Sequence, residues 1–135
     1  VEDARFEGAA RQVGVDLLAS ALPEVRAHPA LLQRAIENVV RNALRHSPPG
    51  GVVRIEAGVT GNRLHLCIAD QGPGVPEAAL DRIFRPFFRG VGQASGDGYG
   101  LGLAIAERVI VAVDGRIRAR NRDAGGLAVE IELAV

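Results

Sequence analysis

Apolar residues recur every three to four positions in two stretches of the chain, a spacing that predicts two amphipathic α-helices. The first stretch covers residues 29–46 and is expected to stop at the Ser-Pro-Pro-Gly-Gly run of residues 47–51. The second covers residues 100–114 and is expected to stop at Asp114 and Gly115. The inward-facing residues of this second helix are predicted to be Leu101, Ala104, Ile105 and Val109 or Val111.

Other stretches alternate apolar and polar residues, which is the pattern of half-buried β-strands. Two hairpins are predicted, over residues 52–70 and 117–135, and residues 1–26 carry weaker strand patterns expected at a sheet edge. A short helix is expected from Pro76 to about Ile83. One face of the hairpins is charged and is expected to lie in water: Arg54, Glu56, Arg63, Arg116, Arg118, Arg120, Glu130 and Glu132. The predicted fold class is an α/β (α+β) two-layer sandwich, a mixed, mostly antiparallel sheet with about three helices on one face.

Two asparagines interrupt the first helix, although asparagine is a poor helix former. Asn38 and Asn42 lie one turn apart beside the apolar stripe, and Arg45 and His46 continue that edge towards the helix end. Two interpretations remain open. The asparagines are tolerated surface residues, or they line a ligand site and offer an amide oxygen to a hard cation.

Asp70 comes two residues after Ile68 on the apolar side of its strand, so its carboxylate is predicted to point inward. An inward carboxylate is costly unless it is paired. Gly72 and Gly74 follow at once, so the segment is either an ordinary Asp/Gly/Pro turn or a site where Asp70 accepts a hydrogen bond from a buried ligand.

A glycine-rich stretch, residues 96–103, leads directly into the second helix. Glycine lets main-chain N–H groups approach a ligand, and the first turn of a helix leaves such donors unpaired, so this stretch suits phosphate. The alternative is a flexible turn before a core helix. The residues before it, about 89–99, lack periodicity and are predicted to form a lid-like loop.

All 16 basic residues are arginine, which excludes a Walker A loop, a protein-kinase strand lysine and a lysine Schiff base. The 16 acidic residues balance them, so the charge does not indicate nucleic acid or an anionic membrane as the main partner. Cys67, the single cysteine, is expected to be a small hydrophobe within a strand. No apolar run has the length of a membrane span, and we expect the chain to be part of a longer protein.

Three sequence blocks occur in a fixed order: Glu-Asn-Val-Val-Arg-Asn-Ala at 37–43, Asp-Gln-Gly-Pro-Gly at 70–74 and Gly-Tyr-Gly-Leu-Gly-Leu at 98–103. Together they resemble the N, G1 and G2 boxes of the catalytic, ATP-binding domain of bacterial sensor histidine kinases, and residues 84–88 resemble its F box. The resemblance covers essentially the whole chain. Within the family, residues 41–49 and 70–76 look most like envelope-stress sensors of the CpxA type.

The resemblance implies a Bergerat fold, shared with gyrase-type ATPases, as one catalytic domain over residues 1–135. It implies Mg-ATP as ligand and transfer of the γ-phosphate to a histidine on the dimerisation and phosphoacceptor domain of the same parent kinase. A response regulator would act downstream, and no contact with nucleic acid or membrane is expected. The sensing, membrane-spanning and phosphoacceptor parts are expected outside this chain, which would be a cytoplasmic domain of an inner-membrane kinase. No histidine here stands in a phosphoacceptor context, so the chain is not expected to autophosphorylate alone.

By matching position, the resemblance also assigns residues to the metal and the phosphates. Asn42 would hold Mg²⁺, with Asn38 supporting the metal and the phosphates, and Arg45 would meet phosphate. Arg89 is a candidate for contact with the γ-phosphate. The phosphate cradle would be formed by Gly98, Tyr99, Gly100, Leu101, Gly102 and Leu103.

The resemblance also assigns residues to the adenine base. Asp70 would accept a hydrogen bond from the adenine amino group, Gly72 and Gly74 would shape the base pocket, and His46 would flank adenine or ribose. The family often has tyrosine at the position of His46.

Two departures from related patterns bear on the chemistry. Gyrase-type ATPases are expected to carry a glutamate base where Asn38 stands, so vigorous ATP hydrolysis is not expected here. His28 replaces the usual aspartate before the first helix, which would affect capping more than chemistry. A GHL-type ATPase module, an anti-sigma-factor-type serine kinase and a homologue that only binds ATP remain the alternatives.

Overall fold

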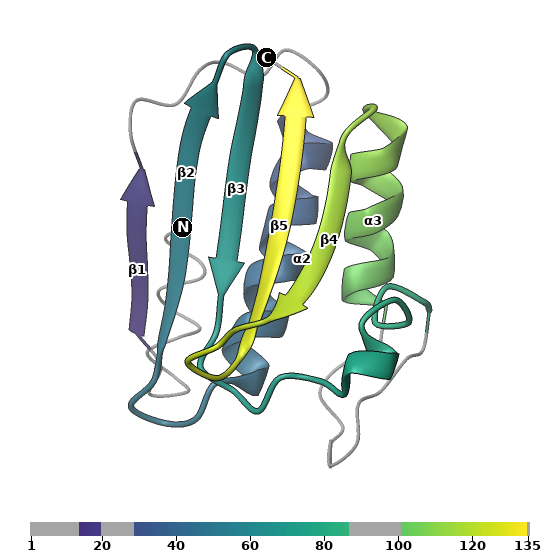
Figure 1. Ribbon diagram of the computed structural model, residues 1–135. Helices are drawn as coiled ribbons and strands as arrows, with labels where there is room; N and C mark the ends of the chain where they lie inside the picture. Colours follow the sequence, from purple (N-terminus) through teal and green to yellow (C-terminus); the bar gives the residue numbers. More distant parts are fainter. Residues whose placement is uncertain (1–13, 20–28, 87–100, 135) are drawn as a thin grey trace.

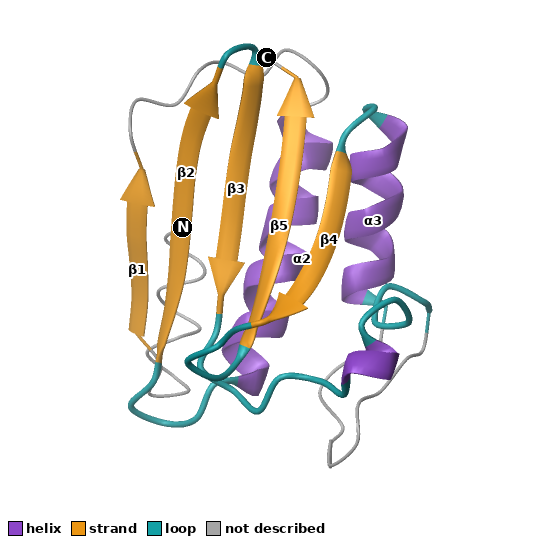
Figure 2. Ribbon diagram, in the orientation of Figure 1, coloured by secondary structure: helices purple, strands orange, loops and turns teal. Residues whose placement is uncertain are grey.

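The computed structural model describes residues 14–19, 29–86 and 101–134 (Figure 1). Within these ranges two α-helices, α2 (Pro29–His46) and α3 (Gly102–Ala112), cover one face of a five-stranded sheet (Figures 1 and 2). A short 3₁₀ turn, η1 (Glu77–Ala79), lies between the sheet and α3 along the chain. The strands are β1 (Gly14–Ala19), β2 (Val52–Thr60), β3 (Arg63–Ala69), β4 (Arg116–Asn121) and β5 (Leu127–Ala134).

The strand order in the sheet is β1-β2-β3-β5-β4. β1 pairs in parallel with β2 at one edge, and the remaining pairs are antiparallel. This arrangement confirms the predicted two-layer α+β sandwich with a mixed, mostly antiparallel sheet. Both hairpins have their strand ends within a residue or so of the predicted ones.

Helix α2 buries most of the stripe that its sequence predicts, with Leu31 exposed. Its buried residues are Leu32, Ala35, Val39, Val40, Ala43 and Leu44. The helix packs against α3 and contacts β2 and β3, so the stripe forms much of the core. The backbone N–H of Ser47 still donates to the Ala43 carbonyl at 3.1 Å, and the two prolines that follow cannot continue the helix. The helix therefore ends where the predicted polar edge ends.

The buried face of helix α3 agrees only in part with the predicted one. Leu103, Ala104, Ala106 and Ile110 are its buried residues. Of the predicted residues, Ala104 is buried and Val109, the first of the two alternatives, packs against the core, whereas Leu101 is 36% exposed and Val111 is 60% exposed. Nearly every residue of this helix is apolar or small, so the spacing alone allows several faces, and packing against α2 selects one.

The segment after β3 is less helical than expected. Only Glu77–Ala79 forms a 3₁₀ turn, and residues 80–86 continue as turns rather than as a helix to Ile83. Ile83 and Phe84 are nevertheless buried in the core. Their packing fixes this connection, so a regular helix is not required there.

The sheet face opposite the helices carries the predicted charges. Glu130 lies 3.6 Å from Arg118 and 3.4 Å from Arg120, and Glu132 lies 3.6 Å from Arg63. All of these side chains are partly or largely exposed. The prediction that this face lies in water is confirmed for the part of the sheet whose side chains are described. Among the described residues, no helix combines the length and the apolar character that a bilayer span requires.

Candidate functional site

The segments that carry the sequence motifs meet at one end of the sandwich. The end of α2, the loop that follows β3 and the first turn of α3 all lie at the end of the sheet where β3 stops (Figure 1). We call residues 70–76 the Asp70 loop. Arg89, Gly98, Tyr99 and Gly100, together with the predicted lid at about 89–99, lie outside the described residues.

Asp70 is 2% exposed and points inward, as its position after the apolar face of β3 predicts. Its Oδ1 accepts hydrogen bonds from the backbone N–H of Gly72 at 2.9 Å and of Leu127 at 3.0 Å. Its own backbone N–H donates to the Leu127 carbonyl at 2.9 Å. Two donors at one oxygen offset the cost of burying the carboxylate and hold its orientation fixed.

The Asp70 loop lies directly against the end of α2. A Cβ at Gly72 would collide with the carbonyl oxygen of His46, so only glycine permits this contact. The backbone N–H of Gln71 lies 3.5 Å from Ser47 Oγ, and Gln71 Oε1 accepts the N–H of Val52 at 2.9 Å. The loop is thus joined to the segment that leads from α2 into β2.

His46 lies near enough to Asp70 and Arg45 for both charges to affect its pKa. Burial lowers the pKa of His46 below its ordinary value of 6.5; the charge of Asp70 opposes this shift and that of Arg45 adds to it. The imidazole is therefore neutral at pH 7. A neutral, half-buried ring beside Asp70 can pack against a planar group or exchange a hydrogen bond with it.

The polar edge of α2 also contacts α3. Asn38, Asn42 and Arg45 are half-buried. A Cβ at Gly102 would lie 3.8 Å from Arg45 Nη2 and from the Asn38 carbonyl oxygen, so Gly102 brings the first turn of α3 beside this edge without a side chain between them. The buried amide nitrogen of Asn38, Nδ2, has no hydrogen-bond partner among the described residues. A buried donor without a partner indicates a place where a ligand or water belongs.

The first turn of α3 has no side-chain cap. Its N-terminal N–H groups therefore have the geometry for an anion, as the glycine-rich sequence predicts. Leu101 is exposed, whereas the side chain of Leu103 is buried in the core, so Leu103 can offer only its backbone to a ligand. The described ranges contain no group of three or more His, Cys, Asp or Glu that could hold a metal ion.

Two polar residues at the end of β4 bind the Asp70 loop and were absent from the predicted site. The side chain of Asn121 pairs with the backbone of Val75, and Arg122 Nη1 donates to the Asp70 carbonyl at 2.6 Å. Asn121 follows Ile117 and Ala119 on the inward side of its strand, which is the same signal that identified Asp70. The sequence therefore did contain an indication of Asn121.

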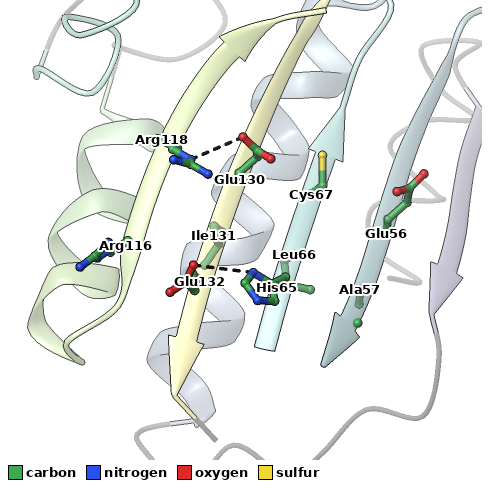
Figure 3. A pocket seen from close by; sticks show the side chains of 11 residues that line it. Glu56, Ala57, His65, Leu66, Cys67, Arg116, Arg118, Glu130, Ile131 and Glu132 are labelled. Carbon is green, nitrogen blue, oxygen red and sulfur yellow. Dashed lines mark ion pairs between the residues drawn. The ribbon is translucent and has the colours of Figure 1, made fainter. Parts of the chain in front are cut away.

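A hollow of about 340 Å³ lies on the open face of the sheet (Figure 3). His65 and Arg118 line it: His65 Nδ1 lies 3.7 Å from Glu132 Oε2, and Arg118 forms an ion pair with Glu130 at 3.6 Å. Burial raises the pKa of the Cys67 thiol at its floor, and the charge of Glu130 raises it further, so the thiol is not activated. This hollow lies on the face away from α2 and α3 and contains none of the motif residues.

Comparisons with known proteins agree on one family. The family model described as "Histidine kinase-, DNA gyrase B-, and HSP90-like ATPase" matches residues 27–135. The sensor protein PfeS of Pseudomonas aeruginosa is 46% identical over 101 residues, which are 75% of this chain and 22% of PfeS. The chain thus spans about a fifth of that relative. The expected likeness to CpxA-type sensors stays a prediction.

Two solved structures share the fold over 98% of the chain. The mycobacterial sensor histidine kinase MprB has a TM-score of 0.89, with 31% identity and 89% of that chain covered. Full-length ShkA, in complex with AMPPNP, has a TM-score of 0.82, with 28% identity and 27% of that chain covered. The fold, the meeting of the described parts of the motifs and these likenesses together show that the chain belongs to the histidine kinase-, DNA gyrase B- and HSP90-like ATPase family, among the catalytic domains of sensor histidine kinases.

Proposed function

We propose that this chain binds Mg-ATP and donates its γ-phosphate to a histidine on a separate phosphoacceptor domain of the same parent kinase. The family implies ATP binding. The observation that carries the proposal is the meeting of the α2 polar edge with both the Asp70 loop and the first turn of α3. Only this end of the described molecule combines a buried carboxylate, a buried unpaired amide and an uncapped helix start.

Adenine would bind beside the Asp70 loop, with the Asp70 carboxylate accepting a hydrogen bond from its amino group. The carboxylate is buried and held by two backbone donors, so it would not need to reorganise when the base arrives. Gly72 and Gly74 would shape the base pocket by letting the loop pack closely against His46 and Asn121. His46, neutral at pH 7, would flank the adenine or the ribose.

The phosphates and the metal would bind between α2 and α3. Asn38 Nδ2, which has no partner among the described residues, and the absence of a side chain at Gly102 fit this placement. Asn42 would hold Mg²⁺ through its amide oxygen, with Asn38 in support, and Arg45 would contact phosphate. Bound Mg²⁺ would neutralise the charge that develops on the phosphoryl oxygens.

Backbone N–H groups of the first turn of α3 would complete the phosphate site. They would come from Leu101, Gly102 and Leu103, with Gly98, Tyr99 and Gly100 before them. Arg89 would reach the γ-phosphate. These last four residues enter the proposal from their sequence alone.

Phosphoryl transfer requires chiefly alignment of the acceptor and neutralisation of charge, which this site would supply. A neutral imidazole on the acceptor is already a nucleophile, so the chain needs no general base of its own. Attack by water would need such a base, and an asparagine, Asn38, stands where gyrase-type ATPases are expected to have a glutamate. Transfer to histidine is therefore favoured over steady hydrolysis.

The parent protein would combine this domain with a dimerisation and phosphoacceptor domain and would act on a response regulator. We place the domain on the cytoplasmic side of the inner membrane. These assignments rest on the likeness to the sensor protein PfeS, of which the chain spans only about a fifth.

The test is to mix the chain with radiolabelled Mg-ATP and its cognate histidine-bearing hairpin. We expect label on the hairpin that is stable to base and lost in acid, as for phosphohistidine. Acid-stable label, or none, would overturn the proposal. Asn42→Ala should abolish the transfer, whereas Asn62→Ala, in the exposed turn between β2 and β3, should leave it unchanged.

A further inference from the structure

The Asp70 loop contains no regular secondary structure, so its shape depends on hydrogen bonds from other segments. Several of these come from the end of β4 and from the start of β5, which lie beside the loop at the same end of the sheet (Figure 1). The loop that would receive adenine is thus attached to a part of the chain about 50 residues later.

Asn121 binds the far end of the loop much as a neighbouring strand would. Its Oδ1 accepts the backbone N–H of Val75 at 2.9 Å, and its Nδ2 donates to the Val75 carbonyl at 2.6 Å. Nδ2 also lies 3.4 Å from Glu77 Oε1, at the start of η1. A side-chain amide that satisfies both polar groups of one residue fixes that residue in position and in rotation.

Gly74 makes room for this side chain. It has a φ of +72°, and a Cβ there would lie 2.5 Å from Asn121 Oδ1. The glycine is therefore required by the contact with Asn121 as well as by the backbone conformation. This contact gives Gly74 a role in holding the loop, independent of any ligand.

Arg122 binds the near end of the loop. Its Nη1 donates to the carbonyl of Asp70 at 2.6 Å, while the Asp70 side chain accepts from Leu127. The main chain of Asp70 is thus held by Arg122, directly after β4, and its side chain by Leu127, the first residue of β5. A charged donor at this distance makes a strong hydrogen bond.

We propose that Asn121 and Arg122 are positioning residues that hold the two ends of the Asp70 loop and thereby set the preference of the site for adenine. This inference rests on the proposed function. Neither residue needs to touch the nucleotide. By fixing the loop before the base arrives, they spare the cost of ordering it on binding, and they keep the Asp70 carboxylate aligned with an amino group rather than with a carbonyl.

The test compares the dissociation constants of the chain for Mg-ATP and Mg-GTP by calorimetry. In Asn121→Ala and in Arg122→Ala we expect ATP to bind about tenfold more weakly, with little change for GTP. A tenfold effect is what the loss of one hydrogen bond to a charged group, or of a pair of hydrogen bonds, would produce. The GTP/ATP ratio of dissociation constants should therefore fall. Arg120→Ala is the matched control, since Arg120 pairs with Glu130 on the open face of the sheet, and it should keep the wild-type ratio.

A merely structural role would not change this ratio, because molecules that remain folded would keep the same preference. Arg122→Lys, which retains a cationic donor, should recover much of the wild-type ratio. The double variant Arg122→Ala with Asp70→Asn should lose less binding free energy for ATP than the two single variants lose together. If Asn121→Ala fails to fold, Asn121→Asp keeps the acceptor for Val75 and should give an intermediate ratio. A wild-type ratio in folded Asn121 and Arg122 variants would overturn the inference alone. A wild-type chain that binds no ATP would overturn the proposed function itself.

Discussion

Asp70 and Leu127 exchange two hydrogen bonds: the Asp70 N–H donates to the Leu127 carbonyl at 2.9 Å, and the Leu127 N–H donates to Asp70 Oδ1 at 3.0 Å. The first continues the pairing of β3 with β5 by one step, and the second replaces a backbone acceptor with a carboxylate. Asp70 therefore extends the pairing of β3 with β5 and is also the residue that we propose receives adenine. These two roles can be separated by substitution.

Asp70→Asn should remove adenine recognition and leave the fold nearly intact. The amide oxygen can still accept from Gly72 and Leu127, but an amide no longer offers two acceptor oxygens to an amino group. We expect ATP binding to fall by at least about tenfold in calorimetry, for loss of a charged hydrogen bond.

Asp70→Ala is the contrasting variant. It leaves the N–H groups of Gly72 and Leu127 without their acceptor, so the free energy of unfolding should fall by about 1–3 kcal/mol in urea titrations. Equal stability of the alanine and asparagine variants would contradict this account.

Gly126→Ala should be far more destabilising than Gly125→Ala. Both glycines have left-handed φ values, +97° and +100°, so either alanine should cost about 1–2 kcal/mol of backbone strain. A Cβ at Gly126 would in addition collide with the carbonyl oxygen of Asp70, whereas one at Gly125 meets open space. The difference between the two free energies of unfolding isolates the contact with Asp70. Similar values would show that the turn can move away from the Asp70 loop.

Much of the fold follows from local patterns that tertiary packing reinforces. The apolar stripe of α2, the alternation in β2 and β3 and the charged face of β4 and β5 each point to one burial pattern, and the structure has that pattern. The predicted inward face of α3 was wrong at Leu101, because a helix with so few polar residues does not by itself specify which side packs on α2.

The site was predictable only where one residue broke the pattern of its own element. Asn38, Asn42 and Asp70 do so, whereas Arg122 continues the alternate spacing of outward arginines along β4 and so resembles one more solvated charge. Its contact with Asp70 depends on a pairing across 52 residues, which no local pattern encodes. The strand ends at Asn121, and the side chain that follows is free to turn towards the loop.

Asn38→Ala should stabilise the chain without nucleotide and weaken its binding of Mg-ATP. The substitution removes a buried amide nitrogen that has no partner among the described residues, and alanine is the better helix former by up to about 0.7 kcal/mol. Thermal unfolding without ligand and calorimetry with Mg-ATP would measure the two effects. A loss of stability in the free chain would show that Asn38 supports the helix rather than a ligand.

Gly102→Ala should weaken the binding of the phosphates and leave the binding of the base largely unchanged. A Cβ there would meet Asn38 and Arg45 only at ordinary contact distances of 3.8–3.9 Å, so the fold has room for it and the free energy of unfolding should change by less than about 1 kcal/mol. The added methyl would stand between α3 and the α2 polar edge, where we propose the phosphates bind. ATP should therefore weaken far more than adenosine, and the double variant with Gly100→Ala should weaken it further. Equal losses for ATP and adenosine would mean that the phosphate site is misplaced.

His46 should make stability fall as the solution is acidified below about pH 6.5. Burial lowers the pKa of His46 from 6.5, with Asp70 opposing the shift and Arg45 adding to it, so the folded chain binds fewer protons at this residue than the unfolded chain. When the unfolded state binds more protons, the free energy of unfolding rises with pH; the gain is complete above about pH 6.5 and is lost as the pH falls towards the folded pKa. Urea titrations between pH 5 and pH 8 would measure this slope, and His46→Gln, which cannot take up the proton, should have a shallower one. An unchanged slope in His46→Gln would assign the acid sensitivity to other groups and would remove the argument that the ring is neutral beside Asp70.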